Sequence, residues 1–336
     1  MAEPEQVRTY SPGGSIFDIP DEVPVVWGSG TEALWVEGEA FILAGPSGVG
    51  KTTTIGQVVR GLIFGGEVFG LPVVSHGKVL YLAMDRPAQI ARSLRRHFTP
   101  NQRASLDKHL AIWKGPPPGD LAKNPGLLTA MCREARAGVV IVDSLKDAAI
   151  GLSEDTVGAG YNNARQMALA AGVQVAELHH QTKRGNNGDK PSTLSDVYGS
   201  TWITSGAGSV ALLWGSAGDP IVELRHLKQP ADPVGPLKIL HDHSAGVSRV
   251  IDDNDPKLIL GANHKGMTAR DMAAAMFGTD KPSANEIEKA RRKLNRLLES
   301  GLALATDTPT VSGVQPTKVY YPSKGSTQGS TLPISA

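Results

Sequence analysis

Short apolar runs alternate with helix-like segments from about residue 23 to residue 250. A fully apolar run of strand length, followed by a segment with apolar residues at helical spacing, is typical of a parallel sheet covered by helices. Repetition of this unit predicts an α/β fold with a mostly parallel sheet. The parallel strands are expected over residues 40–44, 78–83, 110–113, 138–142 and 173–178.

The apolar runs beyond residue 200 follow one another without long helices between them. Strands joined by short connections pair antiparallel, because a parallel pair needs a crossover of about a dozen or more residues. The runs at 207–214, 220–226 and 237–241 are therefore expected to add an antiparallel extension to the sheet.

A different pattern begins near Met267 and predicts a small second domain. Thr268 can cap a helix that runs to about Phe277, and Ser283 begins a long amphipathic helix that ends before Gly301. Two short apolar stretches after this helix would form a two-stranded wing. The whole pattern resembles a winged helix.

The long helix of this second domain carries a basic face. Apolar residues recur at helical spacing along it, so Arg292 and Lys293 are expected to point outward. They are candidate DNA contacts. Because a winged helix can also bind proteins, an interaction with replication proteins is the alternative, and the fold alone does not decide between them.

These patterns divide the chain into five segments. The first is polar and rich in proline, glycine and serine, and the fourth is a polar stretch between the two domains. The expected segments are a flexible leader (1–22), the α/β domain (23–250), a linker (251–266), the winged-helix-like domain (267–324) and a tail (325–336).

Composition narrows the class of protein. The 336 residues carry a net charge of +1, so nucleic-acid binding would depend on local patches rather than on overall charge. Cys132 is the only cysteine, which excludes an intrachain disulfide and a cysteine-based zinc site, and its apolar neighbours predict a buried, inert thiol. The N-terminus lacks a signal-peptide pattern, and no apolar run approaches the ~20 residues of a membrane span. A cytosolic protein without a membrane partner is expected.

Residues 45–52 form the pattern G-x-x-x-x-G-K-[ST] of a phosphate-binding loop. The loop follows a predicted strand and precedes a predicted helix, so its backbone N–H groups would face a phosphate at the helix N-terminus. Lys51 would reach the β/γ oxygens, and the Thr52 hydroxyl would bind Mg²⁺. The expected cofactors are ATP and Mg²⁺. The candidate nucleotide-binding residues are Gly45, Pro46, Ser47, Gly48, Val49, Gly50, Lys51, Thr52 and Thr53.

The strand at 138–142 leads into a carboxylate, Asp143, as a Walker B strand does. Such a strand is expected to lie beside the phosphate loop. Asp143 would then hold Mg²⁺ through water while Thr52 binds the ion directly. A turn aspartate at a strand end is the plain alternative.

Two further strand ends carry candidate catalytic groups. Asp85 follows the strand at 78–83, where a carboxylate could orient the attacking water. His179 and His180 end the strand at 173–178, but adjacent residues on a strand point to opposite faces, which disfavours a shared metal ion. One of the two is expected to sense the γ-phosphate. Glu177 is the next candidate if Asp85 proves to be solvent-exposed and inert.

Together these motifs resemble the RecA-fold ATPases of the RepA-type hexameric helicase family, over about residues 23–245. The phosphate loop, the strand that ends at Asp85, the strand that ends at Asp143 and the Leu-His-His-Gln-Thr-Lys-Arg-Gly segment follow in that family's order. The resemblance implies a RecA-like P-loop core, ATP hydrolysis at subunit interfaces and DNA in a central channel. It gives catalytic roles to Lys51, Asp85, Asp143, His180 and Lys228, with Lys228 reaching a neighbour's nucleotide.

The chain departs from the family's pattern at three places. Asp85 stands where the family usually has glutamate, which implies slow hydrolysis. Tyr198 and Pro230 stand where related helicases commonly have arginine. The arginine finger is therefore unassigned, with Arg225 and Arg184 as weak substitutes.

Residues 182–197 are polar, basic and rich in glycine and asparagine, directly after the sensor strand. In RecA-like rings this position faces the channel. Lys183, Arg184 and Lys190 suit contacts to the phosphates of single-stranded DNA, without base recognition. A loop that is merely solvated is the alternative.

The leading functional hypothesis is an ATP-driven motor on nucleic acid, a RepA-like, hexameric DNA helicase or single-stranded DNA translocase acting in replication. A recombination ATPase that forms filaments on single strands is the second hypothesis. An ATP-switched loader or replication regulator is the third.

Overall fold

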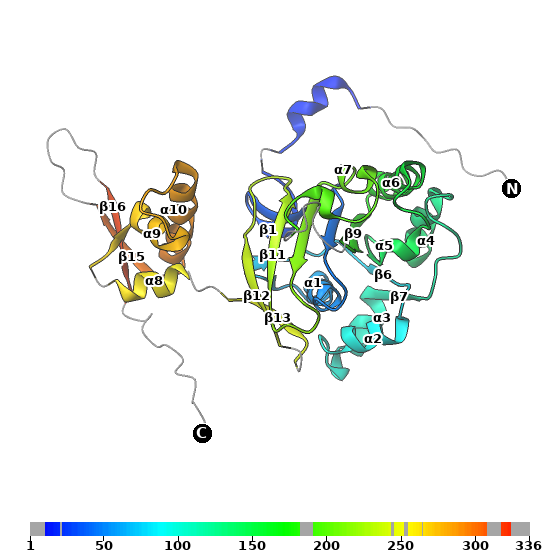
Figure 1. The fold of residues 1–336 in the computed structure, drawn as a ribbon, viewed down its shortest axis with the longest axis horizontal. Coiled ribbons are helices and arrows are strands. Elements are labelled where there is room, and N and C mark those ends of the chain that lie inside the picture. Colours follow the sequence, from blue (N-terminus) through cyan, green and yellow to red (C-terminus); the bar gives the residue numbers. More distant parts are fainter. Residues whose placement is uncertain are drawn as a thin grey trace. The chain divides into compact units, whose positions relative to one another are not determined.

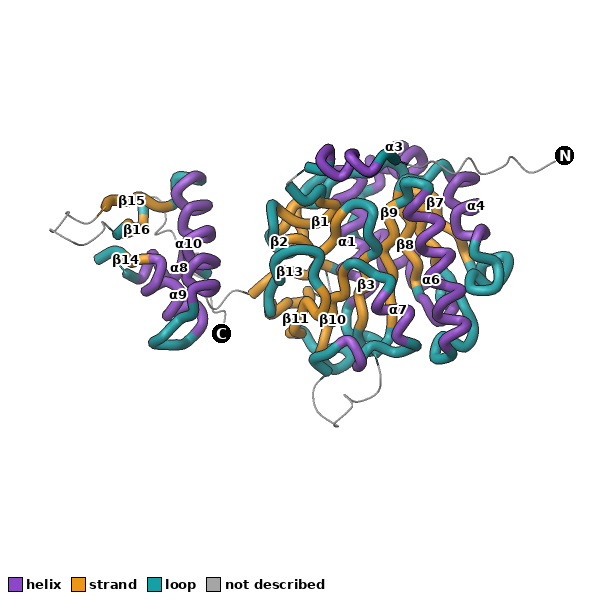
Figure 2. Tube along the Cα trace, turned by 90° about the horizontal axis from the view of Figure 1, so that it is seen from above, coloured by secondary structure: helices purple, strands orange, loops and turns teal. Residues whose placement is uncertain are grey.

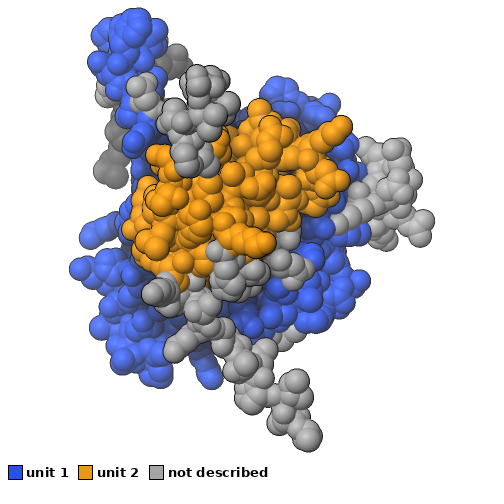
Figure 3. Space-filling model, turned by 90° about the vertical axis from the view of Figure 1, so that its left-hand side faces the viewer, with its two compact units in different colours: residues 1–251 blue, residues 252–336 orange. Residues whose placement is uncertain are grey.

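The computed structural model describes residues 11–20, 22–181, 191–242, 245–251, 255–263, 265–307 and 317–323. The chain divides into two compact units, Met1–Ile251 and Asp252–Ala336 (Figure 3). Within the described ranges, no helix is long and apolar enough to cross a membrane.

The first unit is built on a nine-stranded sheet with the order β13-β12-β11-β10-β3-β9-β8-β6-β7 (Figure 1). The strands from β10 to β7 in this order run parallel, and β11, β12 and β13 each pair antiparallel with the strand before them. The predicted fold class is therefore confirmed. The strands are β3 (Phe41–Ala44), β6 (Val79–Ala83), β7 (Leu110–Lys114), β8 (Val139–Asp143), β9 (Gln174–His179), β10 (Ser209–Trp214), β11 (Ile221–Lys228), β12 (Leu237–Asp242) and β13 (Val247–Ile251).

Helices cover both faces of this sheet (Figure 2). On β8, Val139 and Ile141 pack into the core beneath α1, whereas Val140 and Val142 pack into the core beneath α4 and α6. The parallel strands are buried on both sides, which explains their continuous apolar runs. The helices are α1 (Lys51–Phe64), α2 (Pro87–Arg95), α3 (Arg103–His109), α4 (Gly126–Ala135), α5 (Leu145–Ala148), α6 (Asp155–Ala170) and α7 (Thr201–Ser205).

Smaller elements complete the first unit. A hairpin of β1 (Val25–Ser29) and β2 (Glu32–Val36) packs on the α1 side, and β4 (Glu67–Val68) pairs with β5 (Leu71–Pro72). The expected leader contains a 3₁₀-helix, η1 (Gly13–Asp18), none of whose residues is buried. Two further 3₁₀-helices are η2 (Pro100–Gln102) and η3 (Leu194–Asp196).

The second unit has the element order of a winged helix, with the sheet order β14-β16-β15. The helix starts predicted at Thr268 and Ser283 are confirmed, and each cap is a reciprocal capping box. The elements are α8 (Pro256–Ala262), β14 (Met267–Thr268), α9 (Ala269–Phe277), α10 (Ala284–Glu299), β15 (Ala303–Asp307) and β16 (Lys318–Pro322).

Three expectations for this part of the chain were wrong. The expected linker at 251–266 contains α8, whose Leu260 is buried in the core of the second unit. The wing has a third strand, β14, which pairs with β16. Arg292 and Lys293 are half-buried rather than outward, because α10 packs against α8, α9 and β15.

Candidate active site

The phosphate loop connects β3 to α1 and lies at the carboxyl edge of the parallel strands. Gly50, the residue that caps α1, has a φ of 94°, and Gly45 approaches the backbone so closely that a Cβ would lie 2.4 Å from the Leu213 oxygen. Only glycine fits both positions without strain. The loop therefore turns its backbone into the start of α1, where N–H groups and the helix dipole favour an anion.

Lys51 is nearly buried, and its ammonium group lies in the mouth of this loop. Nζ donates to the carbonyl oxygens of Gly45 at 2.8 Å and Pro46 at 2.7 Å. Burial lowers the pKa of Lys51 to about 8, an effect that the nearby carboxylate of Asp143 opposes. A cation held only by neutral carbonyls is well suited to exchange them for phosphate oxygens.

Thr52 and Asp143 come together beside Lys51. Thr52 Oγ1 lies 3.4 Å from Asp143 Oδ2, and the carboxylate is only 8% exposed. Burial raises the pKa of Asp143, while hydrogen bonds from Tyr81 and Thr52 and the charge of Lys51 oppose this effect. A hydroxyl and a carboxylate next to a phosphate site are the oxygen ligands that Mg²⁺ prefers, so these residues fit the ion.

The position of β8 in the sheet corrects one expectation. The strand of Asp143 does not lie beside the strand of the phosphate loop, because β9 lies between them and pairs with both. Asp143 still reaches the loop, since Thr52 is on the first turn of α1, the helix that packs across this face of the sheet.

His179 and His180 point to opposite faces of the sheet, as predicted. His180 follows Leu178 in the alternation and shares the α1 face, where the charges of Lys51, Lys146 and Asp147 act on it. Burial lowers its pKa to about 4, so the ring is neutral. This placement favours His180 as the group that senses phosphate.

His179 lies on the other face and is fully buried. Its Nε2 lies 2.5 Å from the carbonyl oxygen of Tyr198, and because a carbonyl can only accept, Nε2 carries the proton. Burial lowers its pKa to about 3. His179 therefore holds the backbone at Tyr198 and does not face the phosphate loop.

Glu177 shares the face of His179 and is neutralised there. Its carboxylate accepts two hydrogen bonds from the Arg165 guanidinium, at 2.9 and 2.7 Å, and one from the Tyr161 hydroxyl at 2.9 Å. All three side chains are fully buried. This closed network makes Glu177 a structural residue and removes it as an alternative catalytic group.

Asp85 lies just beyond the end of β6. Its side chain is 41% exposed and forms a 3.2 Å ion pair with the neighbouring Arg86. Its charge acts on His180, which places both near one edge of the sheet. Asp85 is therefore near the site but accessible to solvent.

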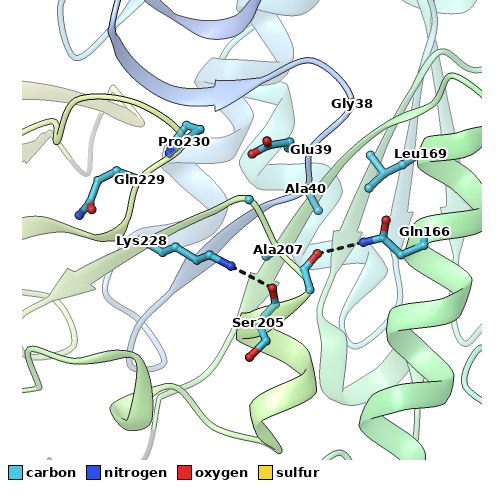
Figure 4. Close-up of a pocket in the computed structure, with 12 residues that line it drawn as sticks. Gly38, Glu39, Ala40, Gln166, Leu169, Ser205, Ala207, Lys228, Gln229 and Pro230 are labelled. Carbon is cyan, nitrogen blue, oxygen red and sulfur yellow. Dashed lines mark hydrogen bonds between the residues drawn. The ribbon is translucent and has the colours of Figure 1, made fainter. Parts of the chain in front are cut away.

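Lys228 lies at the opposite edge of the sheet from its own phosphate loop. It ends β11 opposite Val210 near the start of β10, and its Nζ donates to the carbonyl oxygens of Thr204 at 3.3 Å and Ser205 at 2.9 Å (Figure 4). A hollow of about 430 Å³ opens beside it, lined also by Glu39. Lys228 cannot act on the nucleotide of its own chain. Arg225, on the same strand, is paired with Glu223.

The predicted DNA-binding residues of the loop, Lys183, Arg184 and Lys190, lie outside the described residues. The segment that carries them is closed at its base. Tyr198 N donates to the His180 carbonyl at 3.1 Å, and Gln181 forms a bridge with Val197.

Two residues of the site were not anticipated from the sequence. The Tyr81 hydroxyl donates to Asp143 Oδ2 at 2.7 Å, and His241 Nε2 lies 3.0 Å from the carbonyl oxygen of Val49. Tyr81 was the only polar-tipped residue in an apolar strand, which was a usable signal. His241 gave none, because its contact is 192 residues distant. Cys132 is buried as predicted, which raises its pKa to about 12.

Comparisons with known proteins give this geometry a family. A model of the AAA_25 family, described as an AAA domain, matches residues 15–186. No curated protein matches the chain. One solved structure, titled as the ATPase domain of another protein, is similar at 16% identity and a TM-score of 0.46, covering 63% of this chain and 84% of that one. Because the family model spans more than half of the chain and includes the phosphate loop, the protein belongs to the AAA_25 family of P-loop ATPase domains.

Proposed function

We propose that this ATPase is a nucleic-acid motor, a RepA-like DNA helicase or single-stranded DNA translocase that acts in replication. It would work as a homo-oligomer, with six copies as the expected form, and would use ATP with Mg²⁺. Its DNA contacts would be Lys183, Arg184 and Lys190 of the loop, with Arg292 and Lys293 of α10 as further candidates.

One observation carries the proposal: the segment expected to bind DNA is joined at both ends to the residue that faces the phosphate site. It begins directly after His180, and it returns at Tyr198, whose N–H bonds to the His180 carbonyl at 3.1 Å. The neighbouring His179 ring holds the carbonyl of the same Tyr198. A change in how His180 contacts a phosphate would therefore move the base of the loop.

The position of Lys228 supports an assembly of several copies. Its ammonium group lies a full strand length from its own phosphate loop, so a role in hydrolysis requires the site of a neighbouring subunit. In the single chain its charge is held by the Thr204 and Ser205 carbonyls, which a neighbour's phosphate would replace.

The chemistry follows from the groups in the site. Lys51 would transfer its Nζ from the loop carbonyls to the β/γ oxygens, and Thr52 and Asp143 would hold Mg²⁺, which supplies charge neutralisation on the phosphates. Asp85 would orient the attacking water. The neutral ring of His180 would donate a hydrogen bond to the γ-phosphate. Positioning and electrostatics account for most of the rate in such reactions.

The test compares two sets of neutralised residues in the full chain. Replacing Lys183, Arg184 and Lys190 by alanine should weaken single-stranded DNA binding and reduce its salt slope by roughly 0.7 for each lost phosphate contact. Basal ATP turnover should persist. The comparison variant replaces Arg292 and Lys293. If only this second variant loses DNA binding, the channel model fails. If neither variant matters, nucleic acid is not the partner, although the ATPase assignment stands.

A second candidate is an ATP-switched loader or regulator, in which binding matters more than turnover. The exposure of Asp85 favours it, since this short carboxylate is paired with Arg86 and Glu177 is sequestered by Arg165. Strand-displacement and turnover assays, with and without single-stranded DNA, separate a motor from a switch. DNA-stimulated turnover without strand displacement would indicate the recombination alternative.

A further inference from the structure

The Walker B carboxylate is held by a tyrosine on the neighbouring strand. Ala83 pairs with Asp143 across β6 and β8, and Tyr81 pairs with Ile141, so the two side chains share the α1 face one step apart. The Tyr81 hydroxyl donates to Oδ2 of Asp143 at 2.7 Å. The longer contact from Thr52, at 3.4 Å, ends on the same oxygen. Within the described residues, both hydrogen bonds of this carboxylate therefore fall on Oδ2.

The hydroxyl of Tyr81 has no packing role of its own. The ring is fully buried in the core beneath α1. A phenylalanine would fill the same space, and a buried hydroxyl is costly unless it forms a hydrogen bond. The bond to Asp143 is thus what the oxygen atom contributes at this position.

A second tyrosine in this unit provides a contrast. Tyr161 also donates to a buried carboxylate, that of Glu177, at 2.9 Å. There the carboxylate is neutralised by the two hydrogen bonds of Arg165, so it has no remaining charge for a ligand. Among the described residues Asp143 has no such partner, because the nearby cation, Lys51, donates to the carbonyls of its own loop. Of these two tyrosine–carboxylate pairs, it is the Tyr81–Asp143 pair that is open to a metal.

We propose that Tyr81 is a positioning residue for the magnesium site: its hydroxyl fixes Asp143 through Oδ2 and leaves the other oxygen for the ion or its bound water. The inference rests on the proposed role of Thr52 and Asp143 toward Mg²⁺. Groups that orient a metal-binding carboxylate commonly change metal affinity by about 10- to 100-fold when removed. Tyr81 would therefore set how much Mg²⁺ the protein needs, without contacting nucleotide.

The test measures metal-dependent nucleotide binding with a fluorescent ADP analogue, over a range of Mg²⁺ concentrations. Tyr81→Phe should raise the Mg²⁺ concentration at half-maximal effect by roughly 10-fold, while binding in EDTA stays unchanged. Tyr161→Phe is the matched control, since it removes the same atom from the other pair and should leave the Mg²⁺ midpoint unchanged. In an Asp143→Asn background, Tyr81→Phe should have no further effect on the midpoint.

Two results would overturn the inference, and they differ. If wild type requires Mg²⁺ and Tyr81→Phe has the same midpoint, Tyr81 has no positioning role. If wild type binds the analogue equally well with and without Mg²⁺, the magnesium assignment of Thr52 and Asp143 fails first. Thermal unfolding of both tyrosine variants checks that each is folded at the assay temperature. A midpoint shift shared by Tyr161→Phe would also contradict the proposal, because it would indicate general loosening.

Discussion

The ring of His241 supports the carbonyl oxygen of Val49 in the phosphate loop, at 3.0 Å from Nε2. The other ring nitrogen, Nδ1, lies 2.6 Å from Oγ of Ser248 on the next strand. The ring also packs so closely on Gly50 that a Cβ there would lie 2.5 Å from it. Since β12 and β13 belong to the antiparallel extension, this extension does more than widen the sheet. It braces the loop at the point where α1 begins.

Removal of this support should weaken both the fold and nucleotide binding. His241→Ala leaves the Val49 carbonyl without its partner, and we expect a loss of about 1–3 kcal/mol in the free energy of unfolding. Affinity for ATP, measured by titration, should fall several-fold. The control is His226→Ala, a buried histidine of β11 that bonds Ser209 and the Val234 N–H away from the loop. It should lose comparable stability but keep its ATP affinity. Equal affinity losses in the two variants would contradict a specific role for His241.

The lowered pKa of Lys51 makes nucleotide binding depend on pH. In the ligand-free protein the pKa is about 8, against an ordinary value of 10.5, so the ammonium form declines above pH 8. Because phosphates bind the ammonium form, ATP affinity should fall by up to about tenfold per pH unit from pH 8 upward. Stability moves the other way: the unfolded chain keeps this proton up to pH 10.5, so this group stabilises the fold as pH rises between the two values. Isothermal titration from about pH 7 to 9.5 measures the affinity.

Lys51→Ala provides the reference for this pH series. It should abolish ATP turnover, because the cation that binds the β/γ oxygens is lost. Its residual ATP binding should show no decline above about pH 8. Turnover at the parent rate would show that the active site lies elsewhere.

Asp85 can be tested without changing its size. Asp85→Asn should leave ATP binding nearly intact and reduce turnover by about 10²-fold or more, since the charge that orients water is gone. Asp85→Glu should retain or raise the rate, because the longer side chain has the reach usual in the resembling family. Single-turnover hydrolysis measures both. An unchanged rate in Asp85→Asn would identify Asp85 as a solvated strand-end residue.

Glu177 should prove structural. Glu177→Gln leaves the buried Arg165 guanidinium without its counter-charge, at an expected cost of about 3–5 kcal/mol in unfolding free energy. Turnover per folded molecule should stay the same, because this face of β9 is turned away from the phosphate loop. Urea unfolding and turnover at low temperature test the two claims separately. A fall in turnover without a fall in stability would return Glu177 to the catalytic candidates.

The sequence was a good guide to the strands and a poor guide to their neighbours. Runs such as Val139–Asp143 are apolar throughout because both faces are covered, and that property is visible locally. The order of strands depends on packing between distant segments, so the insertion of β9 between β3 and β8 was not visible. Alternation along β9 showed that His179 and His180 diverge. Which of them faces the phosphate loop required the location of α1.

The same limit applies to the site. The phosphate loop, Thr52 and Asp143 were found because their spacing is fixed by local backbone geometry. The roles of Tyr81 and Glu177 depend on which side chain lies across from them. The short helix α8 was missed because it has few apolar residues of its own, and it is held by contacts with β16 and α9.

The strand order also affects how the chain is made. The strand that carries the phosphate loop, β3, pairs only with β9 and β10, which begin at Gln174 and Ser209. During synthesis β3 therefore leaves the ribosome with both edges unpaired and keeps them so until most of the first unit has been translated. An unpaired apolar strand is a template for association with other chains. Newly made copies of this protein are thus most prone to aggregate before β10 has emerged, and chaperone binding during that interval would have its largest effect on yield.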